Sequence, residues 1–72
     1  MTEIELEEWA VKNGWKVTRV GPNTYRWDHP GVAEGFAPLS FDCEVEDRSS
    51  IRLAGYALEA VRTHWERTVS RN

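Results

Sequence analysis

Apolar residues recur along this chain with two periods, one typical of helices and one typical of strands. Near the start, four positions at helical spacing predict a helix over residues 2–13. Thr2 and Glu5 have the spacing of a capping box, in which each side chain satisfies the other residue's free amide. Gly14 then supplies a left-handed stop, after which Trp15 folds back on the helix end. The predicted inward face comprises Leu6, Trp9, Ala10 and Asn13.

Three segments that alternate between apolar and polar residues follow, and each predicts a strand. Residues 15–20 and 24–29 flank a Gly-Pro-Asn turn at 21–23, which indicates a β-hairpin. After a loop over residues 30–36, residues 37–46 alternate again. Such alternation indicates a sheet that is covered on one face only. The predicted inward positions are Trp15, Val17, Tyr25, Trp27, Leu39, Phe41, Cys43 and Val45.

A helical stripe returns in the last third of the chain and predicts a second helix from Ser49 or Ser50 to about Val69. Two helices on one face of three antiparallel strands give a two-layer α+β fold of order αβββα. Residues 1–72 are too few for two ordinary domains, so we expect a single domain. The inward stripe of the second helix comprises Ile51, Ala54, Leu58, Val61, Trp65 and Val69.

The opposite side of this helix is the first of two predicted binding surfaces. Leu, Tyr and Arg on an exposed helix face are residue types enriched in protein interfaces. A mixed surface with a few harmless apolar residues accounts for the same pattern equally well. An oligomer formed through this face would add stability that a small core lacks. The second-helix face comprises Leu53, Tyr56, Ala60, His64, Arg67 and Arg71.

The formal net charge of −3 is unevenly distributed. Residues 1–47 hold ten acidic against four basic residues, whereas residues 48–72 hold five arginines against two glutamates. The overall sign favours a protein partner over a nucleic acid, because each phosphate contact needs a basic group. No Gly-punctuated loop supports a cation site among the acids of residues 42–47, so a solvated strand edge explains them better. The second predicted binding surface is acidic and comprises Glu3, Glu7, Asp42 and Glu44.

The single cysteine, Cys43, has no partner for an internal disulfide, and no Cys/His cluster has zinc-ligand spacing. Cys43 alternates with apolar strand residues, where a cysteine behaves as a small hydrophobe rather than as a nucleophile. The acidic start does not resemble a signal peptide, and no apolar run has the length of a membrane helix. We therefore expect a cytoplasmic protein without a metal or cofactor.

His29 follows Asp28, which raises the hypothesis of a general base oriented by a carboxylate. Adjacent strand residues point to opposite faces of a sheet, so Asp28 is badly placed to orient His29. The pattern favours a structural histidine at the end of a strand.

The order of these elements resembles that of the HicA toxins of HicAB modules, which are small domains with a double-stranded-RNA-binding-like αβββα fold. The resemblance spans roughly residues 5–60 and implies the same fold here. The matching residues are Asn13, Gly14, Trp15, Arg19, Gly21, Tyr25, His29, Pro30 and Gly31.

The chain departs from that family where the chemistry resides. HicA toxins carry a serine and then the catalytic histidine directly after the turn glycine, and here Pro22 and Asn23 hold those positions. One extra residue precedes His29, and the chain is acidic where HicA domains are usually basic. The resemblance implies RNA cleavage only weakly, because the catalytic residue is absent.

Three functional hypotheses remain. The first is a non-catalytic interaction module that binds a protein or a second copy of itself, such as an inhibitor or accessory protein of a phage or mobile element. The second is a HicA-like RNA-binding protein or mRNA interferase that uses the arginines of the last helix. The third is a structural subunit of a larger assembly. The missing histidine, the sign of the charge and the small size together favour the first hypothesis over RNA cleavage.

Overall fold

The computed structural model describes residues 2–31 and 38–69, and the predicted order of helices and strands is confirmed within them. Helix α1 (Glu3–Lys12) begins with the predicted capping box. The amide of Thr2 donates to Glu5 Oε1 at 2.8 Å, and the amide of Glu5 donates to Thr2 Oγ1 at 3.2 Å. These two bonds satisfy amides that have no partner within the helix.

The predicted stop of α1 at Gly14 is also confirmed, with a φ of +101° that favours glycine. The amide of Trp15 then donates back to the carbonyl of Ala10 at 3.0 Å, which turns the Trp15 side chain into the core. Asn13 does not face inward as predicted. It is exposed, and its side-chain amide donates to the carbonyl of Trp9 at 2.7 Å, because carbonyls in the last turn of a helix need donors from outside the helix.

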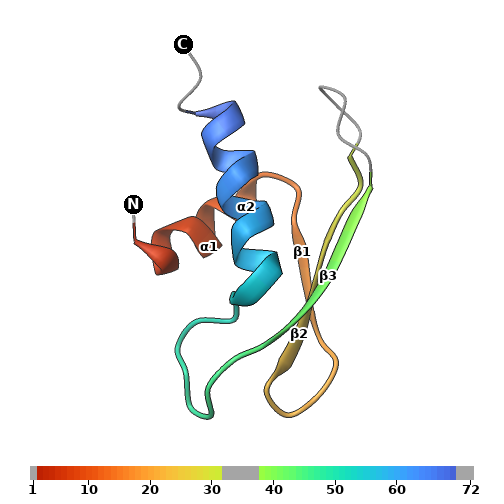
Figure 1. Cartoon of the computed structure of the whole chain (residues 1–72), viewed down its shortest axis with the longest axis vertical. Helices are drawn as coiled ribbons and strands as arrows, with labels where there is room; N and C mark the ends of the chain where they lie inside the picture. The colour runs from red at the N-terminus through yellow and green to blue at the C-terminus, as the bar shows by residue number, and fades with distance from the viewer. Residues whose placement is uncertain (1, 32–37, 70–72) are drawn as a thin grey trace.

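A three-stranded antiparallel sheet follows, and its strand order is the same as the chain order. Its strands are β1 (Lys16–Arg19), β2 (Thr24–His29) and β3 (Leu39–Glu44). Val17 pairs with Trp27, and Trp27 pairs with Phe41, so these three side chains share one face. Figure 1 shows both helices on the same side of this sheet.

The two faces of the sheet differ as the alternation predicts. On the covered face Trp27 is fully buried, and Cys43 is 7% exposed. On the open face the side chains are polar and pair across strands. Arg26 forms an ion pair with Asp42 at 2.8 Å, and Ser40 donates to a carboxylate oxygen of Asp28 at 2.6 Å. The outer face therefore satisfies its polar groups without a covering layer.

Helix α2 (Gly55–Thr68) begins later than predicted. The expected start lay at residues 49–50, but residues 51–54 are extended. Gly55 has a φ of +54°, and a right-handed helix cannot continue through a left-handed residue. Ser49 makes a local turn instead, in which its hydroxyl accepts the amide two residues later at 3.2 Å.

The buried face of α2 is rotated from the predicted stripe. Val61 is fully buried as predicted, whereas Leu58 and Trp65 are partly buried and Val69 is 50% exposed. The helix packs against both β3 and α1, so a wide arc of its surface is covered. The buried residues of α2 are Ala57, Val61 and His64.

The segment over residues 51–54 lies over the sheet and contributes to the core. Leu53 is 1% exposed. The carbonyl of Arg52 accepts two hydrogen bonds, one from Trp27 Nε1 at 2.8 Å and one from Cys43 Sγ at 3.3 Å. The core thus joins α1, the sheet, this segment and α2 into one cluster. Within residues 2–31 and 38–69, no helix has the length and apolar character needed to cross a bilayer.

Candidate functional site

An open groove of about 340 Å³ is lined by acidic residues that are distant in the sequence. Glu44 lines it at the end of β3, although the strand register places its side chain on the same open face of the sheet as Asp42. Glu3 comes from the first turn of α1, Glu44 from the end of β3, and Glu46 from the turn that follows. None of the described residues that line it is basic. We call this site the acidic groove. It is lined by Glu3, Glu44, Val45, Glu46, Ser49, Ile51, Leu53, Ala54, Gly55 and Leu58.

The floor of the acidic groove is apolar. Its apolar side chains come from residues 51–54, from Val45 and from Leu58 at the start of α2. Leu53 is anchored in the core, whereas Ile51 is partly exposed. An apolar floor within an acidic rim suits a ligand that combines a positive charge with apolar surface.

Gly55 leaves the groove open at the start of α2. A Cβ atom placed on Gly55 would meet no other atom within 4 Å. Ala54 holds the N-cap position, and its side chain cannot accept a hydrogen bond from the first turn of α2. The groove therefore ends at two small residues, Ala54 and Gly55, at the start of α2.

Glu7 was predicted to belong to the acidic surface, and this is wrong, because its side chain is buried. Glu7 is 7% exposed, and its Oε1 accepts the amide of Arg52 at 2.6 Å. The Arg52 Nε atom lies 3.5 Å from the same oxygen. A carboxylate can be buried in this way because charged donors and backbone amides compensate its lost hydration. Glu7 holds in place the segment that forms the groove floor.

Asp42 is exposed as predicted, but it lies on the open face of the sheet, outside the acidic groove. Its two carboxylate oxygens accept hydrogen bonds from Arg26 at 2.8 and 3.3 Å. The hydrogen bond from Arg26 lowers the pKa of the Asp42 carboxyl. Of the four acids predicted to form the surface, the structure brings together Glu3 and Glu44.

The predicted second-helix face does not form a single exposed surface. Leu53 precedes the helix and is buried, and His64 is 9% exposed, so both are corrections to the prediction. Tyr56 is 82% exposed, Ala60 is partly buried and Arg67 is exposed. Arg71 lies outside the described residues. Helical spacing placed Leu53 on this face, but Leu53 precedes the first residue of α2, so that spacing does not apply to it.

His64 is buried because a second buried residue supplies its hydrogen bond. Trp15 Nε1 donates to His64 Nδ1 at 2.9 Å. The His64 ring also lies 4.9 Å from the Trp9 ring and 4.9 Å from the His29 ring, centre to centre. These four rings, which we call the ring cluster, join α1, the turn after it, β2 and α2. An aromatic ring with a polar atom packs well where the polar atom finds a partner.

The position of His29 in the ring cluster depends on Gly14. A Cβ atom on Gly14 would lie 3.0 Å from His29 Nε2, so a larger residue there would collide with the ring. His29 Nδ1 accepts the amide of Gly31 at 2.9 Å. The Asn-Gly-Trp and His-Pro-Gly sequences thus lie close together, and their contacts fix the local backbone conformation.

Asn23 lies away from the ring cluster. Its carbonyl accepts the amide of Val45 at 2.8 Å, and it lines a separate open hollow with Arg19 and Arg48. The structure therefore does not bring Asn23 to either histidine. Neither does it support a nucleophilic role for Cys43, because burial raises the pKa of that thiol and disfavours the thiolate.

No group of three or more His, Cys, Asp or Glu residues has metal-binding geometry within residues 2–31 and 38–69. The groove residues that the sequence did not assign to a binding surface are Val45, Glu46, Ser49, Ile51, Ala54, Gly55 and Leu58. The acidic run over residues 42–47 was visible, but its proximity to Glu3 depends on the path of residues 45–54, which alternation does not encode.

Comparisons of this chain with protein-family models, with curated proteins and with solved structures gave no match. The geometry and charge of the site are therefore the basis on which a function is inferred.

Proposed function

We propose that this domain is a non-catalytic protein-interaction module whose acidic groove binds a basic, partly apolar segment of another protein. The observation that carries the proposal is an open groove with an apolar floor, whose lining includes Glu3, Glu44 and Glu46 and no basic residue among those described. Complementary charge guides association and selects partners, while burial of the apolar floor supplies affinity.

The charge of the groove favours a protein over a nucleic acid. A phosphate backbone would be repelled by the acidic residues of the groove, and it would gain nothing from an apolar floor. Lysine and arginine side chains match this surface, because their long apolar stems can lie on the floor while their charged ends reach the rim. A domain that covers such a basic segment would act as an inhibitor or accessory protein of its partner.

The chemistry-bearing residues support a non-catalytic role. Cys43 is buried beneath residues 51–54, and His64 holds the indole of Trp15. HicA-like RNA cleavage stays the alternative hypothesis, and no observation favours it over protein binding.

The proposal is tested by titrating the ¹⁵N-labelled domain with acetylated and amidated peptides that contain two arginines among serines and alanines. We expect amide shifts at residues 44–58 that weaken with salt, since the Debye length falls with ionic strength. A Glu44→Lys, Glu46→Lys variant should lose at least tenfold in affinity. Both positions are exposed, so the fold should persist.

Glu8→Lys is the matched control, because Glu8 is exposed on α1 and lies outside the groove. It changes the net charge by the same amount per substitution. Equal losses in the Glu8 variant and in a single Glu44→Lys variant would show that binding follows net charge, and the groove would no longer be the site. Shifts confined to the open face of the sheet would have the same consequence.

A further inference from the structure

A second hollow adjoins the acidic groove along α2. It has a volume of about 110 Å³ and lies between the start of α1 and the second half of α2. Glu3 lines both sites, so the two meet at the first turn of α1. We call it the Trp65 hollow. It is lined by Thr2, Glu3, Leu6, Arg62, Trp65 and Glu66.

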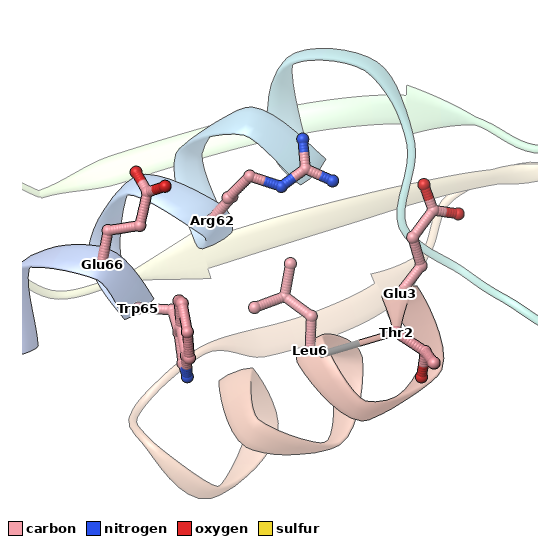
Figure 2. Close-up of a pocket in the computed structure, with 6 residues that line it drawn as sticks. All are labelled: Thr2, Glu3, Leu6, Arg62, Trp65 and Glu66. Carbon is pink, nitrogen blue, oxygen red and sulfur yellow. The ribbon is translucent and has the colours of Figure 1, made fainter. Parts of the chain in front are cut away.

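Leu6 and Trp65 form the apolar part of the Trp65 hollow. Figure 2 shows Leu6 pointing from α1 toward α2, with Trp65 on one side of it and Glu3 on the other. Leu6 is 4% exposed and fixed in the core, and Trp65 packs against the core while part of it stays exposed. An aromatic wall beside a fixed aliphatic residue is typical of pockets that receive an anchor side chain.

The rim of this hollow carries one basic residue against two acidic ones. Arg62 lies 3.5 Å from Glu59 one turn earlier, and the rim also carries Glu3 and Glu66. The guanidinium of Arg62 would oppose a second cation here, so this site differs from the acidic groove. A hollow of this volume takes one aliphatic side chain, since an apolar cavity of roughly 150 Å³ holds a benzene molecule.

We propose that the two sites form one bipartite docking track, in which the acidic groove takes a basic side chain and the Trp65 hollow takes an aliphatic anchor of the same partner segment. This inference rests on the proposed function. Leu58 in the groove and Trp65 in the hollow are seven residues apart, which is roughly 10 Å along a helix. An extended peptide covers that span in about three residues. The partner segment therefore carries a basic residue and an aliphatic residue three positions apart.

The test compares two acetylated and amidated peptides that differ at one position. One has arginine followed three residues later by leucine, the other has serine in place of the leucine, and both have serine or alanine elsewhere. We expect the leucine peptide to bind about tenfold more tightly, because burying one aliphatic side chain contributes this much or more. The indole N–H signal of Trp65, identified with Trp65→Phe, should shift with the leucine peptide alone. The indole signal of the buried Trp27 serves as the reference.

The outcomes separate the two proposals. If both peptides shift the groove amides equally and the Trp65 indole stays unmoved, the bipartite track is wrong while the groove remains a binding site. If neither peptide shifts residues 44–58, the proposed function itself fails. A Trp65 indole signal that moves with protein concentration in the absence of peptide would assign the hollow to a second copy of this chain, which also overturns the bipartite track.

Discussion

Polar side chains from different elements lie near the two ends of helix α2, and they are used in opposite ways. Near its C-terminal half, His64 is buried in the ring cluster, and its Nδ1 atom holds the indole of Trp15 at 2.9 Å. At its N-terminal end lies the acidic groove, whose lining includes the exposed residues Glu44 and Glu46 from the end of β3 and the turn after it. Histidine and tryptophan side chains therefore pack the domain, whereas exposed carboxylates line the open site.

This difference matters in a domain of 72 residues. So small a core has little stability to spare, so histidine and tryptophan contribute most as packing groups. A binding site made from surface carboxylates does not lower the stability of the core. The comparison predicts that variants in the ring cluster lose stability, whereas variants at the groove lose binding.

Trp15→Ala should produce the largest loss. We expect a decrease of about 3–5 kcal/mol in the free energy of unfolding, because a buried indole and its hydrogen bond to His64 are both removed. Urea denaturation followed by circular dichroism measures it. Tyr56→Ala is the matched control, since Tyr56 is 82% exposed and should cost less than about 0.5 kcal/mol. Similar losses at the two positions would end the distinction between packed and open regions.

Glu7→Ala should have the next largest effect. Its loss leaves the amide of Arg52 buried without its acceptor, which costs about 1–3 kcal/mol. Glu8→Ala removes the neighbouring, exposed carboxylate and should change the stability by no more than about 0.5 kcal/mol. Denaturation of the two variants side by side gives the difference. Equal stabilities would mean that Glu7 does not fasten the floor of the acidic groove.

A smaller loss of folding stability is expected at alkaline pH, because of the buried thiol of Cys43. Burial raises the pKa of its thiol above the ordinary value of 9.0. The unfolded chain therefore ionises first, and stability falls as the pH rises from the ordinary thiol pKa through the raised one. Cys43→Ala should lose less stability than the original protein between pH 7 and about pH 10. Parallel losses in the two proteins would show that Cys43 is not shielded from water in solution.

In an RNA cleavage assay we expect to observe no activity. We expect the purified domain to leave labelled RNA intact at neutral pH, because Asn23 cannot transfer a proton there. Gel analysis against a His29→Ala variant provides the measurement. Cleavage that is present in the original protein and lost in the variant would transfer His29 from the packing residues to the catalytic ones.

Most of the fold follows from local patterns in the sequence. The capping box at Thr2, the stop at Gly14 and the pairing of Val17 with Trp27 are each set by a few neighbouring residues. The inward and outward faces of the strands follow from alternation, as buried Trp27 and exposed Arg26 illustrate.

The start of α2 and the composition of the site could not be read in this way. Gly55 adopts a left-handed conformation, but glycine within an apolar stripe is also compatible with a continuous helix. That choice decided whether Leu53 lay on a helix face or in the core. Glu7 was placed on the surface because its partner, the amide of Arg52, is 45 positions away in the sequence.

The contact between Gly14 and His29 means that the residue allowed at one of these positions depends on the residue at the other. Any side chain at position 14 faces an unfavourable backbone angle and, at 3.0 Å, the imidazole ring as well. A lineage that replaced His29 with a small residue would relieve the second constraint while keeping the first. Among relatives of this chain, a residue other than glycine at position 14 should therefore occur only where position 29 carries a smaller residue than histidine, and a search profile that scores the two positions jointly would be more selective than one that scores them separately.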